Sequence, residues 1–79
     1  MSETQTHDAV VQVWAELLGR TPGGADDFFA MGGHSLLAAR ATARLRRALG
    51  IPLEMSELFD HPVLAAYVDH VDHARKRAR

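Results

Sequence analysis

Apolar residues recur with helical spacing in three segments of this 79-residue chain, and no segment alternates apolar and polar residues like a strand. Glycine and proline separate these segments, so each helix must bury one apolar face against the others. The pattern predicts an all-α fold: a small four-helix bundle with three main helices, one short helix and a long first loop. The expected helices cover about 7–18, 35–49 and 56–59, and the last begins at 62.

Capping residues set the expected boundaries of three of these helices. Thr6 is expected to cap the first helix, and Ser56 the short one. Pro62 fits the first position of the last helix, because its missing N–H needs no partner there. Asp60 or His61 would then cap that helix.

The second helix is expected to open at Ser35 and to stop at Gly50, a residue type that commonly ends helices. Its spacing predicts one buried face, which would pack into the core of the bundle. The predicted buried stripe is Leu37, Ala41, Leu45, Ala48 and Leu49.

A long loop, expected over 19–34, connects the first two main helices and contains five glycines and one proline. A connection of this length is uncommon in a small domain and is usually functional or disordered. Disorder is the poorer interpretation, because Phe28, Phe29 and Met31 are large apolar side chains that favour burial. We expect at least one phenylalanine to pin the loop to the core and so to fix the position of Ser35.

The length fits a single domain over 1–79, with a folded core of about 7–74 and a basic tail over 75–79. The chain has no cysteine, which excludes disulfides, thiolate metal sites and thiol nucleophiles of its own. The N-terminal segment lacks the pattern of a signal peptide, and no apolar run is long enough to span a bilayer. We therefore expect a cytoplasmic protein.

Charge is unevenly distributed although the formal net charge is only −1. No acidic residue occurs between Phe28 and Leu53, and the second predicted helix is rich in arginine. Such asymmetry concerns partners more than fold. The arginines of this segment are Arg40, Arg44, Arg46 and Arg47.

Ser35 stands at the mouth of the second predicted helix, where unpaired backbone N–H groups favour an anion. Gly32 and Gly33 precede it and permit a tight approach of the backbone. These features suit a serine that carries a phosphate group. The simpler alternative is that Ser35 is an ordinary N-cap, which is a common role of serine.

The segment DDFFAMGGHSLLAAR resembles the core motif of peptidyl carrier proteins, the thiolation domains of nonribosomal peptide synthetases, which reads approximately D-x-F-F-x-L-G-G-H-S-L-x-A. The resemblance extends over about 10–71, and Met31 replaces the usual leucine. The matching residues are Asp26, Phe28, Phe29, Gly32, Gly33, His34, Ser35, Leu36 and Ala38.

This resemblance implies a carrier-protein fold and a function. Ser35 would receive 4′-phosphopantetheine from coenzyme A through a phosphopantetheinyl transferase, with Gly33 and His34 as flanking motif residues. The thiol of that arm would carry aminoacyl or peptidyl groups as thioesters. Further partners would be adenylation, condensation, thioesterase or tailoring enzymes of secondary-metabolite biosynthesis. The chain would be a monomeric carrier that binds neither nucleic acid nor membrane, and not an enzyme.

Acyl carrier proteins of fatty-acid and polyketide synthesis are the related alternative. They generally have an aspartate before the serine and an acidic second helix. Here His34 precedes Ser35 and the helix is basic, so the chain resembles the peptidyl branch more closely.

A helical wheel directs Leu36 away from the predicted buried stripe, beside Ser35. An exposed leucine next to arginines suggests a contact with partner enzymes. The predicted partner contacts are Leu36, Arg40, Arg47, Met55 and Phe59, although Phe59 suits the core equally well.

Three other classes of function fit the sequence less well. A hydrolase elbow needs glycine where Leu37 stands, and adjacent His34 lacks the geometry of a base for Ser35. The arginine-rich helix over 36–49 would allow DNA binding, but the sequence pI of about 6.5 opposes it. His70 and His73 on the last helix do not make a metal site by themselves.

Overall fold

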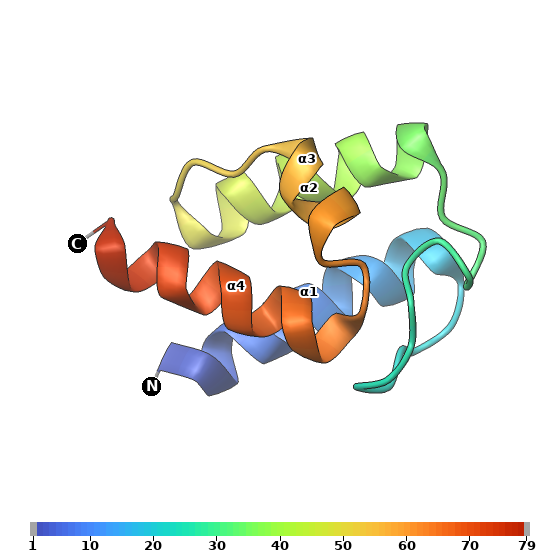
Figure 1. Cartoon of the computed structure of the whole chain (residues 1–79), viewed down its shortest axis with the longest axis horizontal. Coiled ribbons are helices and arrows are strands. Elements are labelled where there is room, and N and C mark those ends of the chain that lie inside the picture. Colours follow the sequence, from blue (N-terminus) through green and yellow to red (C-terminus); the bar gives the residue numbers. More distant parts are fainter. Residues whose placement is uncertain (1, 79) are drawn as a thin grey trace.

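The computed structural model of the protein describes residues 2–78, which form four helices joined by loops. The helices are α1 (Ser2–Leu18), α2 (Ser35–Leu49), α3 (Met55–Asp60) and α4 (Leu64–Arg77). Helix α1 packs against both α2 and α4, and the short α3 packs against α2 (Figure 1). The predicted all-α fold, with three main helices, one short helix and a long first loop, is confirmed.

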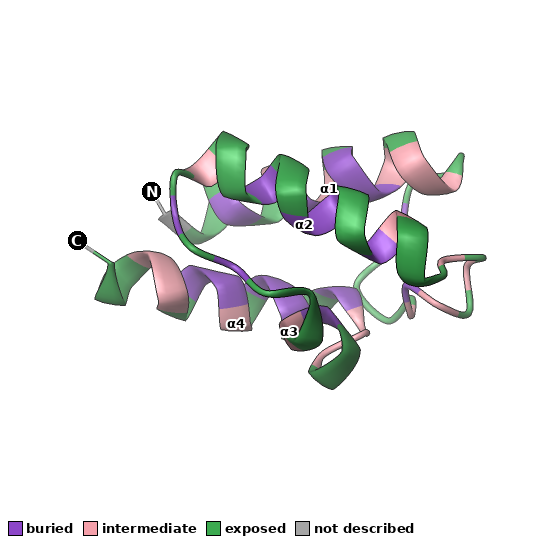
Figure 2. Ribbon diagram, turned by 90° about the horizontal axis from the view of Figure 1, so that it is seen from above, coloured by how far each residue is buried: buried purple, intermediate pink, exposed green. Residues whose placement is uncertain are grey.

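The core lies between the helices, with the buried faces of α1, α2 and α4 turned inward (Figure 2). Trp14 is at its centre and contacts Phe28 edge-on, with ring centroids 5.0 Å apart. Tyr67 packs on the indole at 5.9 Å. Among residues 2–78, no helix is both long and apolar enough to cross a membrane. The fully buried large side chains are Val10, Trp14, Phe28, Leu45, Leu53, Leu58, Leu64, Tyr67 and Val71.

Helix α1 starts more than one turn earlier than predicted, at Ser2, and Thr6 is therefore not its N-cap. Thr6 is fully buried inside the helix. Its hydroxyl donates to Oδ1 of Asp72 at 2.8 Å and accepts from Nη1 of Arg75 at 2.9 Å. These contacts with α4 stabilise the first turns of α1. Capping residues carry no information about such distant contacts, so they predicted a start of α1 that is too late.

Helix α4 continues through Arg77, so the segment predicted as a basic tail over 75–79 is helical over its first three residues; position 79 lies outside the described residues. Arg75 contacts α1, and Nζ of Lys76 lies 3.3 Å from Oδ2 of Asp72. The hydrogen bond from Thr6 lowers the pKa of the Asp72 carboxyl; burial opposes this, and the charges of Lys76 and Arg75 add to it. Asp72 therefore stays ionised between the two helices.

Helix α2 has the predicted bounds, and its C-cap Gly50 adopts a left-handed conformation with φ of 67°. The buried face, however, is centred near Leu45. Leu37 and Leu49 are only partly buried, and Ala48 is exposed, contrary to the prediction. The short side chain of Ala48 lies in the last turn at the edge of the packed face and does not reach the core. The buried residues are Ala38, Ala41, Thr42 and Leu45.

The starts of α3 and α4 were also predicted wrongly. Helix α3 has Glu54 as N-cap, whose N–H donates to Oε2 of Glu57 at 2.7 Å, so Ser56 lies inside the helix. Helix α4 begins at Leu64 with Val63 as N-cap, and Pro62 precedes the helix.

Carbonyl groups of the first loop explain the later start of α4. The N–H groups of Leu64 and Ala65 donate to Asp26 O at 2.9 Å and Gly24 O at 3.0 Å. Phe28 N–H donates to Pro62 O at 2.8 Å. Backbone carbonyls thus accept from the N–H groups of Leu64 and Ala65, so neither Asp60 nor His61 has to cap them.

Phe28→Ala is expected to destabilise the protein by about 3–5 kcal/mol, because it removes a fully buried ring and leaves a cavity beside Trp14. That loss is a large part of the roughly 5–15 kcal/mol that stabilises a typical domain. Urea denaturation followed by tryptophan fluorescence measures it.

Phe29→Ala is the matched control, because Phe29 is the neighbouring residue of the same type but is only half-buried. We expect it to cost less than half as much free energy. Equal losses for the two variants would contradict the interpretation that the buried ring of Phe28 is the main anchor of the loop.

Candidate functional site

Ser35 is the first residue of α2 and is exposed to solvent. The N-cap is His34, which has an extended backbone and makes no side-chain capping bond. The alternative that Ser35 acts as the N-cap is therefore excluded. The first intrahelical bond runs from Ala38 N–H to His34 O at 2.8 Å. The three N–H groups before it have no acceptor within the helix, which leaves a positive helix end next to the hydroxyl.

The loop before Ser35 folds back on itself through a tight set of backbone bonds. Oδ1 of Asp27 accepts from Phe29 N–H at 2.8 Å and from Ala30 N–H at 3.1 Å. Gly32 has a φ of 106°, a conformation that other residues rarely adopt. Gly33 N–H then donates to Phe28 O at 3.0 Å and closes the turn.

Gly33 lies so close to Phe28 that no other residue type fits there. A Cβ atom on Gly33 would overlap the ring of Phe28 and would lie 2.6 Å from its backbone oxygen. The buried ring of Phe28 therefore determines where the backbone of Gly33 passes, and through it the position of Ser35. The sequence indicated that a glycine was needed, but not which atoms require it.

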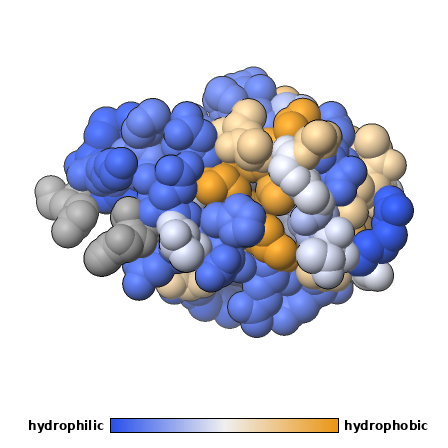
Figure 3. All heavy atoms as spheres, turned by 90° about the horizontal axis from the view of Figure 1, so that it is seen from below, coloured by the Kyte–Doolittle hydropathy of each residue, from blue (hydrophilic) through white to orange (hydrophobic). Residues whose placement is uncertain are grey.

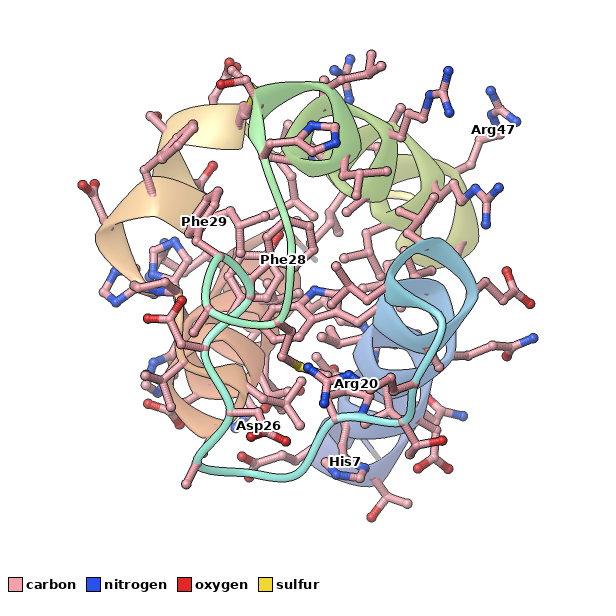
Figure 4. All side chains as sticks on the ribbon, turned by 90° about the vertical axis from the view of Figure 1, so that its right-hand side faces the viewer. His7, Arg20, Asp26, Phe28, Phe29 and Arg47 are labelled. Carbon is pink, nitrogen blue, oxygen red and sulfur yellow. The ribbon has the colours of Figure 1, made fainter. Side chains whose placement is uncertain are left out.

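The two phenylalanines of the loop have different positions, as Figure 4 shows. Phe28 points into the core, while Phe29 lies toward α3 and stacks on Phe59 with centroids 4.9 Å apart and planes 12° apart. Phe59 is therefore not a core residue: 45% of it remains exposed. The stack joins the loop before Ser35 to α3, a contact that sequence spacing gave no sign of.

The predicted partner-contact residues are all exposed, but they do not lie together. Leu36 is 55% and Met55 36% exposed. Arg40 follows Ser35 by less than two turns of α2. Arg47 is twelve residues from Ser35, or about 18 Å along the helix axis, and points away from the bundle (Figure 4). Leu36 and Arg40 are therefore close to the serine, and Arg47 is not.

One of the other arginines of α2 has a partner inside the molecule. Nη1 of Arg44 lies 2.9 Å from Oε1 of Glu16 on α1. Both side chains are about half exposed, so this ion pair adds little stability. The ion pair does, however, neutralise one of the four arginines that DNA binding by α2 would use.

A cluster of titratable groups on α3 and α4 was missed by sequence reasoning. Oε1 of Glu57 lies 2.6 Å from Nε2 of His70, and His61 stacks on His70 with centroids 4.4 Å apart. Burial raises the pKa of Glu57, but the hydrogen bonds from the Glu54 N–H and from His70 outweigh it, so the pKa is lowered overall. Glu54 and Glu57 form a capping box at the start of α3, but glutamate is not a residue type that predicts an N-cap from sequence.

The two histidines of α4 that were considered and set aside as metal ligands have different partners. His70 binds Glu57, and Nδ1 of His73 lies 4.0 Å from Oδ2 of Asp69. Within residues 2–78, no group of three or more histidine or acidic side chains is arranged to hold a metal ion.

The family model described as "Phosphopantetheine attachment site" matches residues 8–71 of this chain. Phosphinothricin tripeptide synthetase PhsB from Streptomyces viridochromogenes is 58% identical over 53 residues, which are 66% of this chain and 4% of that protein. The dimodular nonribosomal peptide synthase of Bacillus subtilis is 42% identical over 73 residues, which are 91% of this chain and 3% of that synthase. This chain therefore spans only a small part of the length of these curated relatives.

Solved structures share the fold. BlmI, a type-II acyl-carrier-protein from Streptomyces verticillus involved in bleomycin biosynthesis, superposes with a TM-score of 0.84 at 30% identity, covering 90% of this chain and 87% of BlmI. The A-PCP structure of McyG with phenylalanyl-adenylate matches with a TM-score of 0.76 at 30% identity, covering 82% of this chain and 10% of McyG.

Proposed function

Because this chain belongs to the phosphopantetheine-attachment family, we propose that Ser35 is the residue that receives its 4′-phosphopantetheine arm. The chain is a peptidyl carrier domain of the nonribosomal peptide synthetase type, and it is not a catalyst. Its role in secondary-metabolite biosynthesis is to carry intermediates on the arm.

The observation that carries the proposal is the position of Ser35 at the open end of α2. The hydroxyl is exposed, it stands beside backbone N–H groups without acceptors in the helix, and a side-chain-free Gly33 precedes it. A phosphodiester on this oxygen would place its negative charge at the positive end of the helix dipole. Since the chain has no cysteine, the thiol of the thioester has to come from the cofactor.

The test is to incubate the purified chain with coenzyme A and a broad-specificity phosphopantetheinyl transferase. Intact-protein mass spectrometry should show the gain of one arm, and fragmentation should place it on Ser35. A gain located on another residue, or no gain with a transferase that loads a known carrier, would overturn the proposal.

We further propose that the surface around Leu36 contacts the transferase and the synthetase domains. Arg40 follows within two turns of α2, and the exposed Met55 and Phe59 of α3 would be further contacts of the same partners. An adenylation domain is one partner class, because the similar McyG structure combines an A domain with a PCP. Condensation, thioesterase and tailoring enzymes are the others. Arg47 would meet a partner only if that partner reaches along α2.

Leu36→Asp is expected to reduce the kcat/KM of loading roughly tenfold or more, because the substitution puts a charge into an apolar contact. Circular dichroism should remain unchanged, since Leu36 is exposed. Ala48→Asp adds the same charge at an exposed position near the other end of α2 and should load normally. If Leu36→Asp loads as fast as the parent chain with every partner tested, Leu36 is not a contact residue.

The remaining proposals concern the state of the chain in the cell. We propose that it acts as a monomer in the cytoplasm, where a cysteine-free carrier is compatible with reducing conditions. Sedimentation of the loaded chain and fractionation of cells that produce it test the two statements separately.

A further inference from the structure

A groove runs along the seam between α1 and α4, on the face shown in Figure 3. Its volume is about 370 Å³. Hydrophobic residues lie near the centre of this face and continue toward the upper right of the view, while hydrophilic residues cover most of the left side and the lower edge. The lining residues include Glu3 and His7 from α1, Gly24 from the loop, and Leu64, Ala65 and Val68 from α4.

The groove is elongated, because its lining extends from the first turns of α1 to the first turns of α4. Leu64 and Val68 form a closed apolar floor, since they are 1% and 3% exposed. Ala65 is exposed and contributes only a methyl group to the wall. This shape has room for one large apolar side chain of a partner and for the backbone that carries it.

Charge is segregated between this face and α2. Residues 1–19 and 51–74 contain no lysine or arginine, so the helical turns along the groove contribute no such cation. Glu3 lines the groove, and the exposed Asp69 lies one helical turn after Ala65 on the same side of α4. Asp8, with 73% of its side chain exposed, adds a further negative charge on α1.

The cations Arg75 and Lys76 in the last turn of α4 are engaged within the bundle. Arg75 donates to Thr6 and Gln5, and Lys76 pairs with Asp72. The helical sides of the groove therefore carry acidic groups beside the lining His7, whereas the exposed side of α2 carries arginines. A partner that fits the groove must bring the opposite charge.

We propose that this groove binds a basic amphipathic helix of a partner protein. One large apolar side chain of that helix inserts between α1 and α4 over Leu64 and Val68. Lysine or arginine side chains on its flanks pair with Glu3 and Asp69. This is the helix-in-groove mode of recognition, with the charges setting the choice of partner.

The groove lies on the lower face of the view in Figure 1, while α2 lies along the upper side. A helix bound in the groove would therefore leave the N-terminus of α2 accessible to enzymes. Such a second contact would raise the effective concentration of the partner around the carrier without occupying its attachment surface. The proposal does not depend on Ser35, and Ser35→Ala should bind the helix unchanged.

The probe is an 18-residue amphipathic peptide of leucine and lysine, titrated into the ¹⁵N-labelled chain at about 150 mM salt. Its matched control is a peptide with the same leucine pattern and glutamate in place of lysine. The leucine–lysine peptide should shift the amide signals of Thr4, His7, Gly24 and Ala65, and the glutamate peptide should not. Shifts confined to the acidic α3 would overturn the proposal.

Two neighbouring alanines of α4 provide matched variants, because both are exposed but only Ala65 lines the groove. Ala65→Arg blocks the groove and adds a repelling charge, so the dissociation constant should rise at least tenfold. Ala66→Arg adds the same charge on the same helix and should change it less than threefold. Equal effects would show general attraction to an acidic surface and overturn the groove assignment.

A third variant keeps the proposal testable if Ala65→Arg does not fold. Glu3→Lys reverses one rim charge on an exposed side chain, and it should weaken binding of the leucine–lysine peptide about threefold or more. An unchanged dissociation constant would overturn the pairing of the rim with the peptide. Concentration-dependent shifts at the groove without any peptide would show a second copy of this chain as the occupant, and would also overturn the proposal.

Discussion

Ser35→Ala is expected to abolish loading completely, so that no arm is added by a transferase that converts the parent chain in full. The substitution removes the only oxygen at the start of α2 to which the arm can be attached, and nothing else in the bundle changes. The side chain is exposed, so thermal stability should remain close to that of the parent. Mass spectrometry and thermal denaturation of the same samples measure both outcomes.

Ser56→Ala is the control for this experiment. Ser56 is the exposed serine of α3 and lies, like Ser35, in the first turn of a helix. A transferase that recognised exposed helix-start serines in general would modify it. We expect Ser56→Ala to load like the parent, and residual loading of Ser35→Ala would mean that a second site exists.

Gly33→Ala is expected to combine a large loss of stability with a large loss of loading. The new Cβ would overlap the Phe28 ring and lie 2.6 Å from Phe28 O, and the ring is held on both sides by Trp14 and Phe29. Trp14 is fully buried and cannot give way without opening the core, so overpacking should cost at least about 1–3 kcal/mol. Relief of the clash by a backbone shift would displace Ser35.

Gly24→Ala separates this effect from the general cost of replacing a loop glycine. A Cβ at Gly24 would meet only the Cβ of Ala65, at an ordinary 3.9 Å. Urea denaturation and loading rates should therefore be close to those of the parent. If Gly33→Ala behaves in the same way as Gly24→Ala, the contact with Phe28 does not fix the backbone at Gly33.

The parts of the fold that sequence reasoning predicted correctly are those determined by local chemistry. Helix α2 has the predicted bounds, because a glycine in a left-handed conformation ends it. An anchoring phenylalanine in the long loop was also predictable, since a large apolar side chain favours burial, but the choice of Phe28 over Phe29 was not.

The parts that were missed depend on contacts between residues far apart in the chain. The first turn of α1 is held by Thr6 against Asp72, 66 positions later. The start of α4 is set by loop carbonyls and not by a side-chain cap. The stack of Phe29 on Phe59 joins the first loop to α3, and neither segment has a periodic pattern of apolar residues. None of these leaves a periodic signal in the sequence.

The tie between Thr6, Asp72 and Arg75 has a mechanical consequence for a carrier. It joins the first turns of α1 to the last turns of α4, so both ends of the described chain leave the bundle on one side (Figure 1). The start of α2 lies at the other end of a molecule whose longest dimension is 33 Å. A domain joined at either terminus would therefore hold the bundle at the end opposite to the start of α2. A small rotation about those ends would then move the start of α2 farther than any part of the bundle near the termini.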